Sequence, residues 1–229
     1  MTFKSILKNI WFAGKLIGAA ILLAICLRVF VFDSFEIPGS SMEPSILQGD
    51  YIFVNKLVLG GRVYKNFDFM KGGKVETKRF WGIRKVKRND VLVFNFPYSD
   101  WSKLDFDLNT FYVKRCVAIP GDTFYIENGI YKVANSKDTL GCYLQQLQVS
   151  EQEDVQLGKA FRCFPKVEGY NWNMNNFGPL YVPGKGECLT IDASNIHLYR
   201  NLICYESGKE VSMQGDTVLL GNEILNKYT

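Results

Sequence analysis

Histidine is nearly absent from this sequence, and its cysteines are not spaced as metal ligands. The chain has one histidine, His197, and six cysteines, none in C-x-x-C spacing. Structural zinc sites usually take four Cys or His ligands from closely spaced pairs. The sequence therefore argues against a metal site, and we expect no cofactor. The scarcity of histidine also limits which base could activate a nucleophile.

Internal repeats and low-complexity tracts are also missing, which excludes solenoids, propellers and disordered tails. The 229 residues, 47% of them hydrophobic and 22% charged, suffice for a membrane anchor and one globular domain with a subsidiary lobe.

Positive charge is concentrated in one segment. Residues 61–90 carry ten Lys and Arg against three Asp and Glu, a net +7 in a chain whose total is +4. The interleaved aromatic residues allow three interpretations: a nucleic-acid patch, a solvated loop, or a surface that contacts anionic headgroups. The predicted location outside the membrane, argued below, excludes a nucleic acid and leaves the other two open.

An apolar stretch near the N-terminus contains few charges. Its charge-free part, Leu16–Leu27, would span only about 18 Å as a helix, short of the roughly 30 Å of bilayer hydrocarbon. Residues 10–32 reach about 34 Å, with Lys15 and Arg28 near enough to the ends to extend toward the headgroups. No small-x-small cleavage site follows. We therefore predict a transmembrane helix at 10–32 in preference to a removable signal.

The distribution of basic residues predicts the orientation of this helix. Lys4, Lys8 and Lys15 lie on its N-terminal side, whereas the first basic residue after Arg28 is Lys56. The positive-inside rule places residues 1–9 in the cytoplasm and 33–229 outside. Five cysteines then lie in an oxidising compartment, so at least one is unpaired; we interpret them as small buried residues with room for one disulfide.

Short strand patterns dominate the rest of the chain. Runs of β-branched and aromatic residues bounded by Gly, Asp or Pro occupy 50–59, 90–97, 111–119, 122–133 and 216–225. Asn128-Gly129 predicts a two-residue hairpin turn. Because no comparably strong amphipathic helix alternates with these strands, we predict a mainly β fold with antiparallel sheets. A Gln-rich, acidic composition after residue 133 predicts a lobe at 134–215, inserted between a β core at 33–133 and a return strand at 216–229.

The stretch FEIPGSSMEPSILQGD, residues 35–50, follows the apolar helix and contains two adjacent serines. Its prolines at 38 and 44 exclude a helix, so Ser40 and Ser41 lie on a fixed bend. Serine pairs in turns often only bend the chain. A nucleophilic serine would need a base, and His197 lies between apolar neighbours, where we interpret it as structural. A lysine base, as in Ser-Lys variants of the catalytic triad, is then required.

Lys114 is the lysine that best fits this role. A free lysine, with a pKa of about 10.4, is protonated at neutral pH, and burial among apolar groups favours the neutral amine. Lys114 lies in NTFYVKRCVAIPGD, residues 109–122, where a strand could bury it on its core side. The alternative is an exposed lysine at a sheet edge.

These motifs together resemble those of bacterial type I signal peptidases. FEIPGSSMEPSILQGD behind a membrane helix resembles the family's first principal motif, and FYVKRCVAIPGD resembles the second. VKRNDVLVFNFP, residues 86–97, is similar to a third motif that lies between them. The resemblance covers about residues 10–133, and more weakly NFGPLYVPGKGE at 176–187.

The resemblance implies a serine endopeptidase of the bacterial cytoplasmic membrane that removes signal peptides from exported preproteins. Ser41 would be the nucleophile and Lys114 the general base. Ser40 stands where most members have Gly, and Gly39 where many have an oxyanion-binding Ser, so the backbone N–H of Ser41 would carry more of that role. The substrate would bind as an extended strand with small residues before the cut. Residues expected to shape its pockets are Phe35, Ile37, Tyr112 and Val113.

One motif of the family has no counterpart here. Its members carry Gly-Asp-Asn followed by Ser-x-Asp-Ser-Arg near the C-terminus, whereas this sequence has QGDT at 214–217 and ends at NEILNKYT. We expect either a truncated chain or a homologue without the segment. The second case gives an alternative function, an inactive membrane-tethered protein that binds exported segments or a secretion partner. The oligomeric state is left open.

Overall fold

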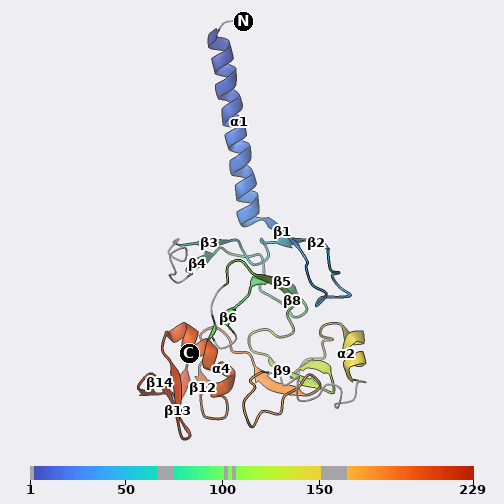
Figure 1. The fold of residues 1–229 in the computed structure, drawn as a ribbon, viewed down its shortest axis with the longest axis vertical. Coiled ribbons are helices and arrows are strands. Elements are labelled where there is room, and N and C mark those ends of the chain that lie inside the picture. The colour runs from blue at the N-terminus through green and yellow to red at the C-terminus, as the bar shows by residue number, and fades with distance from the viewer. Residues whose placement is uncertain (1–2, 66–74, 101–102, 105–106, 151–163) are drawn as a thin grey trace. The chain divides into compact units, whose positions relative to one another are not determined.

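The computed structural model of the chain describes residues 3–65, 75–100, 103–104, 107–150 and 164–229 (Figure 1). The chain divides into two compact units, Met1–Val86 and Lys87–Thr229, and each is described by itself.

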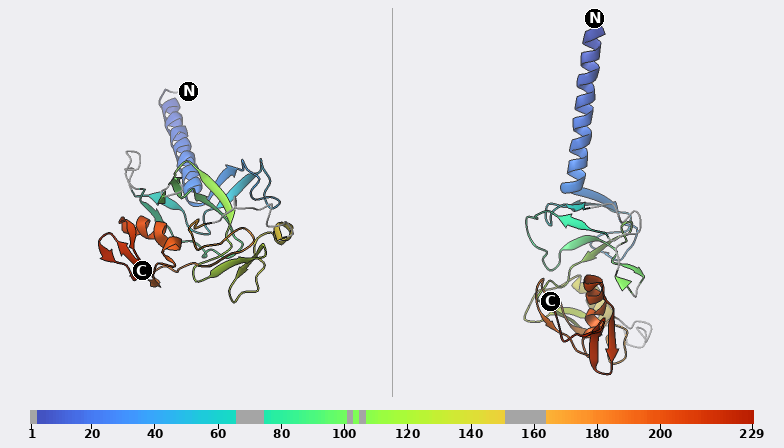
Figure 2. Two further views of the ribbon diagram at one scale, coloured as in Figure 1. Left: turned by 60° about the horizontal axis from the view of Figure 1, so that its bottom comes forward. Right: turned by 90° about the vertical axis from the view of Figure 1, so that its left-hand side faces the viewer.

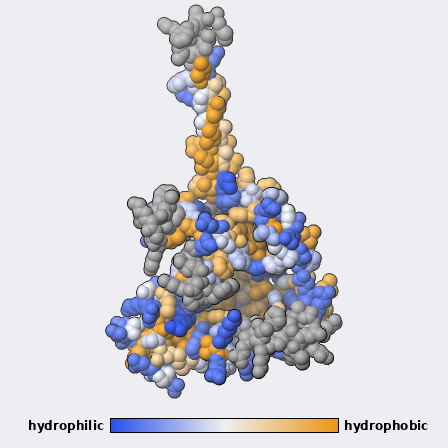
Figure 3. Space-filling view, viewed as in Figure 1, coloured by the Kyte–Doolittle hydropathy of each residue, from blue (hydrophilic) through white to orange (hydrophobic). Residues whose placement is uncertain are grey.

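The first unit begins with the helix α1, Phe3–Phe30. Its part Lys8–Phe30 is long and apolar enough to cross a membrane, and its apolar side chains are exposed (Figure 3). The helix predicted at 10–32 ends earlier because Phe32 already starts a strand. Apolar residues continue from Val29 to Phe32, so the sequence pattern could not distinguish a helix end from a strand start there.

Two antiparallel hairpins complete this unit. Strand β1, Phe32–Glu36, pairs with β2, Tyr51–Asn55, and β3, Arg62–Tyr64, pairs with β4, Thr77–Arg79. The basic segment 61–90 is divided between the units: its described residues up to Val86 belong to the first, those from Lys87 onward belong to the second, and residues 66–74 lie outside the described part of the chain.

The second unit is built from short strands and two described helices. The strands are β5 Val91–Asn95, β6 Tyr98–Asp100, β7 Lys103–Leu104, β8 Phe111–Arg115, β9 Thr123–Glu127, β10 Ile130–Val133, β11 Phe177–Tyr181, β12 Leu189–Thr190, β13 Val211–Gln214, β14 Thr217–Leu220, β15 Glu223–Ile224 and β16 Lys227–Tyr228. The helices are α2, Tyr143–Ser150, and α4, Ile196–Ser207.

Every described strand pairing is antiparallel, which confirms the predicted mainly β fold class. The predicted turn at Asn128-Gly129 is also confirmed. Glu127 pairs with Ile130, and both turn residues have positive φ angles, 49° and 77°. That backbone is the one favoured for two-residue hairpins.

Two hydrophobic clusters hold the second unit together. One contains Phe124, Val133 and Leu140, and the other packs α4 against the C-terminal strands through Ile191, Ile196, Tyr199, Ile203, Val211, Val218 and Leu225. Helix α4 was not predicted, because its buried residues Ile196, Tyr199 and Ile203 are separated by polar ones and its N-cap, Asn195, makes no side-chain capping bond.

The domain boundaries stay predictions, but the strand pairing bears on how they are drawn. Strand β14 pairs with β13 and β15, and β16 pairs with β12. Residues 217–228 therefore pair with each other and with strands inside the predicted 134–215 lobe.

Candidate active site

Ser41 lies in a hydrogen-bonded loop that joins β1 to β2. The base of the loop is closed by Ile37 N–H donating to Asp50 O, at 2.9 Å, and Gly49 N–H donating to Ile37 O, at 2.8 Å. At the tip, Glu43 N–H donates to Ser40 O, at 3.0 Å, which forms a turn around Ser41. Ser41 itself is exposed. The sequence thus presents this serine on a bend that its own backbone bonds stabilise.

Apolar side chains anchor the loop beneath Ser41. Ile37 is 4% exposed and Met42 8% exposed, whereas Gly39 and Ser40 between them are exposed. Strand alternation places Phe35 on the same face as Ile37, and Phe35 is half-buried. Phe35, Ile37, Gly39 and Ser41 thus all lie on β1 or in the loop that follows it, in the first unit.

Lys114 lies on β8 in the second unit and is half-buried. It pairs with Leu92 of β5, and Tyr112 pairs with Phe94. Paired residues of an antiparallel ladder share a face, so Lys114 lies beside Leu92, Phe94 and Tyr112. Its Nζ is 5.8 Å from the centroid of the Tyr112 ring, which stacks on Phe96 at 4.7 Å. Lys114 is thus half-buried on a face that also carries Leu92 and Phe94, and its role stays a prediction.

Val113 points its side chain to the opposite face of β8 from Tyr112 and Lys114. Its backbone N–H and C=O point sideways, in the plane of the sheet. The bonds Phe96 N–H to Thr110 O and Cys116 N–H to Asp90 O place the hydrogen-bonded pairs at even-numbered residues of β8. The backbone N–H and C=O of Val113 therefore face away from β5. No strand in the described part of the chain pairs with that edge.

An ion-pair cluster braces the end of the Lys114 strand, and sequence reasoning did not single it out. Arg88 donates two hydrogen bonds to Asp122, at 2.8 and 2.6 Å, and one to Asp138, at 2.6 Å. Asp122 also accepts from Ile119 N–H at 2.8 Å. The Arg88 guanidinium holds the pKa of Asp122 below its ordinary value, against the opposing effect of burial. Both residues lie in quoted motifs, which was the available signal.

Asn89 connects the same strand to a neighbouring loop. Its N–H donates to Cys116 O at 2.7 Å, its side-chain amide donates to Thr139 O at 2.8 Å, and its Oδ1 accepts from Gly141 N–H at 2.8 Å. Asn89 has a φ of 69°, a left-handed conformation that Asn tolerates better than most residues.

Other expected features lie apart from these residues. His197 is half-buried in the first turn of α4. Among the described residues there is no group of three or more His, Cys, Asp or Glu that could hold a metal ion, and Cys26, Cys116, Cys142, Cys188 and Cys204 are free thiols. Cys163 falls outside the described residues.

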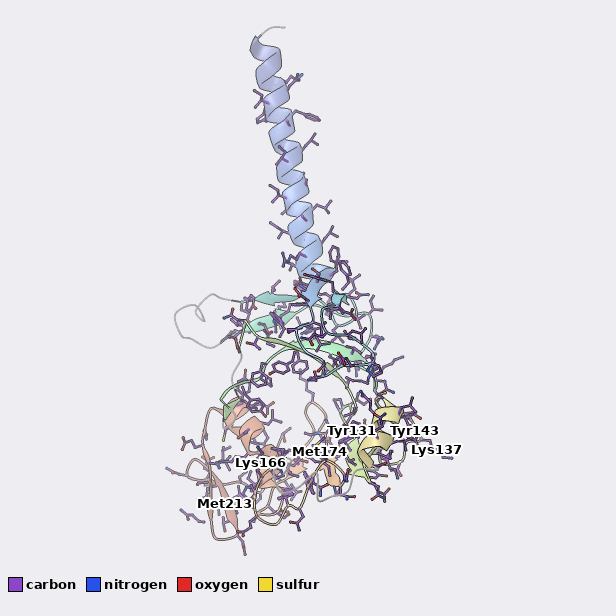
Figure 4. All side chains as sticks on the ribbon, turned by 45° about the vertical axis from the view of Figure 1, so that its right-hand side comes forward. Tyr131, Lys137, Tyr143, Lys166, Met174 and Met213 are labelled. Carbon is purple, nitrogen blue, oxygen red and sulfur yellow. The ribbon has the colours of Figure 1, made fainter. Side chains whose placement is uncertain are left out.

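One cavity of the second unit is not lined by Lys114. It has a volume of about 660 Å³ and is lined mainly by apolar residues of β9, β10 and the segment before β11, among them Phe124, Tyr131 and Met174. Figure 4 labels Tyr131 and Met174. Val117, in the motif at 109–122, also lines this cavity.

Comparison with known proteins decides the family. The profile of one family, described as signal peptidase, peptidase S26, matches residues 10–180. The chain belongs to this family. The match includes both the Ser41 loop and the Lys114 strand, so the resemblance predicted from the motifs is confirmed.

Curated relatives carry the corresponding name. Signal peptidase I of Pseudomonas fluorescens is 33% identical over 109 residues, which is 48% of this chain and 32% of that protein. Signal peptidase I T of Bacillus subtilis is 28% identical over 170 residues, 74% of this chain and 64% of that protein. Signal peptidase I of Rickettsia massiliae is 28% identical over 175 residues, 71% and 61% respectively. The chain thus spans 32% to 64% of the length of these relatives.

Proposed function

We propose that this member of the peptidase S26 family is a membrane-anchored serine endopeptidase that removes signal peptides from exported preproteins. The observation that carries the proposal is that the family match covers both the Ser41 loop and the Lys114 strand. The proposal includes the meeting of these two residues in one catalytic dyad.

In the proposed reaction Ser41 Oγ attacks the carbonyl carbon of the scissile peptide bond. Lys114 Nζ, in its neutral form, takes the hydroxyl proton and then gives it to the leaving amine, which leaves an ester between Ser41 and the signal peptide. A water molecule, deprotonated by the same amine, hydrolyses that ester. Lys114 lies beside the apolar residues Leu92 and Phe94 on one face of the β5–β8 ladder. The backbone N–H of Ser41 would stabilise the oxyanion.

The substrate would bind as an added β-strand. The outward-facing backbone groups of Val113 provide a donor and an acceptor at an edge that no described strand occupies. An unfolded segment next to a cleavage site can form such bonds, and small side chains let it approach closely. In this proposal Phe35, Ile37 and Tyr112 form the shallow pockets beside it.

The proposed location is the bacterial cytoplasmic membrane, with α1 as a single anchor. Residues 1–9 would lie in the cytoplasm and the two hairpins and the second unit outside, because basic residues precede the apolar stretch. Membrane fractionation followed by protease treatment of spheroplasts tests this arrangement. Digestion of the C-terminal part from outside is expected, and protection of that part would reverse the orientation.

The decisive experiment is cleavage of a preprotein with an Ala-x-Ala site by the product of the complete gene in lipid vesicles. Ser41→Ala, Lys114→Met and the double variant should each abolish cleavage to about the same extent, because the two residues act as a unit. Lys114→Arg should also be inactive, since a guanidinium stays protonated. Lys132→Met is the matched control, a lysine on strand β10 of the same unit, and should retain activity.

Two results would overturn the proposal. Activity retained in Ser41→Ala but lost in His197→Ala would assign the chemistry elsewhere. Tight binding of the preprotein by the wild-type protein without any cleavage would favour the alternative function, an inactive membrane-tethered binder.

A further inference from the structure

The membrane helix passes into the Ser41 hairpin with no flexible linker. Helix α1 ends at Phe30 and β1 begins at Phe32. Val31, between them, belongs to both: its N–H donates to Leu27 O at 2.8 Å, and its carbonyl accepts from Lys56 N–H at 2.8 Å. One residue therefore links the last turn of the helix to the hairpin ladder.

The side chain of Lys56 closes the same junction. Its Nζ donates to the helix carbonyl Arg28 O at 2.7 Å and to Asp33 Oδ2 at 2.8 Å. A cation at a helix C-terminus satisfies carbonyls that have no partner within the helix. Asp33 also lies 3.5 Å from Arg28 Nε. Burial raises the pKa of Asp33, but the hydrogen bond and charge of Lys56, the Ser34 N–H and the charge of Arg28 together outweigh this and keep the pKa below the ordinary value.

A second contact braces the other side of the helix end. The ring of Phe80 meets the ring of Phe30 edge to face, with centroids 5.3 Å apart, and Phe80 N–H donates to Gly61 O at 2.9 Å. Gly61 is buried, and a Cβ there would lie only 3.0 Å from Val29 O. The helix end is thus packed too closely for any larger residue at position 61 without displacement.

These contacts fix the direction in which the hairpin leaves the membrane. Figures 1 and 2 show the chain turning away from the axis of α1 where β1 begins; the antiparallel β2 ends there, with Asn55 opposite Phe32. With α1 in a bilayer, the hairpin and its Ser41 loop would therefore stay close to the headgroups. A hinge between α1 and β1 would allow Ser41 a wide range of heights above the bilayer, whereas a braced junction allows only a narrow range.

We propose that Lys56, Asp33 and Gly61 are positioning residues that set the height of Ser41 above the bilayer, and so determine which peptide bond of a membrane-inserted substrate is cut. The substrate class is a polypeptide held in the same bilayer by its own apolar segment. Two chains anchored in one membrane share a common reference plane, so a fixed height for the nucleophile selects bonds at a fixed spacing from that segment. This inference rests on the proposed peptidase function.

The test uses a preprotein with two identical Ala-x-Ala sites, one close to its apolar segment and one several residues further on. The full-length protein in lipid vesicles cleaves it, and mass spectrometry gives the ratio of the two products. Wild type should strongly prefer one site. Lys56→Met removes two charge-assisted bonds, and should lower that ratio by at least about tenfold while total cleavage continues.

Three further variants separate positioning from general stability. Asp33→Asn keeps the shape but removes the charge, and should shift the ratio in the same direction. Lys56→Arg should restore most of the wild-type ratio. Lys65→Met is the control, because Lys65 makes an exposed ion pair with Glu76 and takes no part in the contacts named above at the helix end, and should leave the ratio unchanged.

Hydrogen exchange provides a readout that does not depend on cleavage. The Lys56 amide, bonded to Val31 O, should exchange slowly in wild type and faster in Asp33→Asn. An unchanged product ratio in Lys56→Met and Asp33→Asn, with normal total cleavage, would overturn the inference and leave the proposed function intact. Absence of cleavage in wild type would overturn the function instead.

Discussion

The two units of this protein are stabilised in different ways. Among the described residues, the buried apolar side chains of the first unit are Ile37 and Met42, both in the Ser41 loop, whereas the other ten belong to the second unit. The first unit relies on hydrogen bonds, ion pairs and close glycine packing. It also exposes large apolar residues, including Phe53 at 77% and Trp81 at 100%.

This difference indicates what each unit needs from its surroundings. The second unit completes two apolar clusters from its own residues, so its folding free energy is largely internal. The first unit leaves aromatic surface beside the end of an apolar helix, where a bilayer interface would cover it. Apart from the proposed site residues of β8, variants in the second unit should therefore act mainly on stability, and variants in the first mainly on membrane contact or cleavage.

The largest effect on stability is expected from Arg88→Met. The substitution leaves the Asp122 carboxylate buried with no guanidinium partner, which typically costs about 3–5 kcal/mol. Denaturant unfolding of the second unit measures the loss of unfolding free energy. Hydrogen exchange of the β8 and β9 amides measures the same loss locally. Lys209→Met, which breaks an exposed pair with Glu223, is the control and should change stability by no more than about 0.5 kcal/mol.

The pH dependence of stability should differ in direction between wild type and Arg88→Met. In wild type the pKa of Asp122 is depressed, so its contribution to stability is present above the ordinary Asp range, near about pH 4, and is lost as pH falls through the folded value. In Arg88→Met burial, which raises the pKa of Asp122, outweighs the remaining bond from Ile119 N–H, which lowers it, so acidification should relieve the penalty. A parallel loss of stability in both proteins below that pH would contradict the ion-pair account.

Ile203→Ala should destabilise the second unit by about 2–5 kcal/mol, because Ile203 is 1% exposed in the α4 cluster and the change leaves a cavity. Exchange of α4 amides should accelerate accordingly. Leu202→Ala, one residue earlier and 39% exposed, is the matched control and should remain within about 0.5 kcal/mol of wild type. Equal effects in the two variants would mean that α4 is not packed by the face described.

The strands could be predicted from the sequence because their signals are local. All five predicted strand runs contain strands, and the Asn128-Gly129 turn has the expected backbone. Helix α4 was missed because its buried face consists of only three residues, and its packing depends on strands that follow it in the chain. Long-range packing of this kind leaves little trace in local periodicity.

The candidate site residues were predicted on a different basis. Ser41 and Lys114 were assigned through motif resemblance, supported by the scarcity of histidine, and their roles stay predictions. Arg88 and Asp122 were quoted within those motifs but received no role, because a pair separated by 34 residues cannot be inferred from residue type. The contacts of Lys56 at the helix end could not be predicted from the sequence either, since an isolated lysine after a strand is usually solvated.

Trp81 tests whether the exposed surface of the first unit meets lipid. The difference in tryptophan fluorescence between wild type and Trp81→Phe gives the contribution of Trp81. Brominated lipids should quench this contribution, because an exposed indole beside the helix end would lie in the membrane interface. Replacing the exposed Arg84 and Lys85 with Gln should weaken this quenching in anionic vesicles, at about 1 kcal/mol per cation. Arg88 is left unchanged because it pairs with Asp122. Quenching only by an aqueous agent would favour the solvated-loop interpretation.

The smallest effect should come from Ser40→Ala, which differs from Ser41→Ala by one position. The turn around Ser41 uses the backbone carbonyl of Ser40, which accepts from Glu43 N–H, and alanine supplies the same carbonyl. Neither substitution removes a backbone bond described for the loop, so both variants should fold alike. Steady-state cleavage should stay within about threefold of wild type in Ser40→Ala, since the removed hydroxyl is not the one assigned to attack, and should disappear in Ser41→Ala. Comparable losses of cleavage in the two variants would mean that cleavage depends on the conformation of the bend. Ser41 could then not be distinguished from Ser40 as the attacking residue.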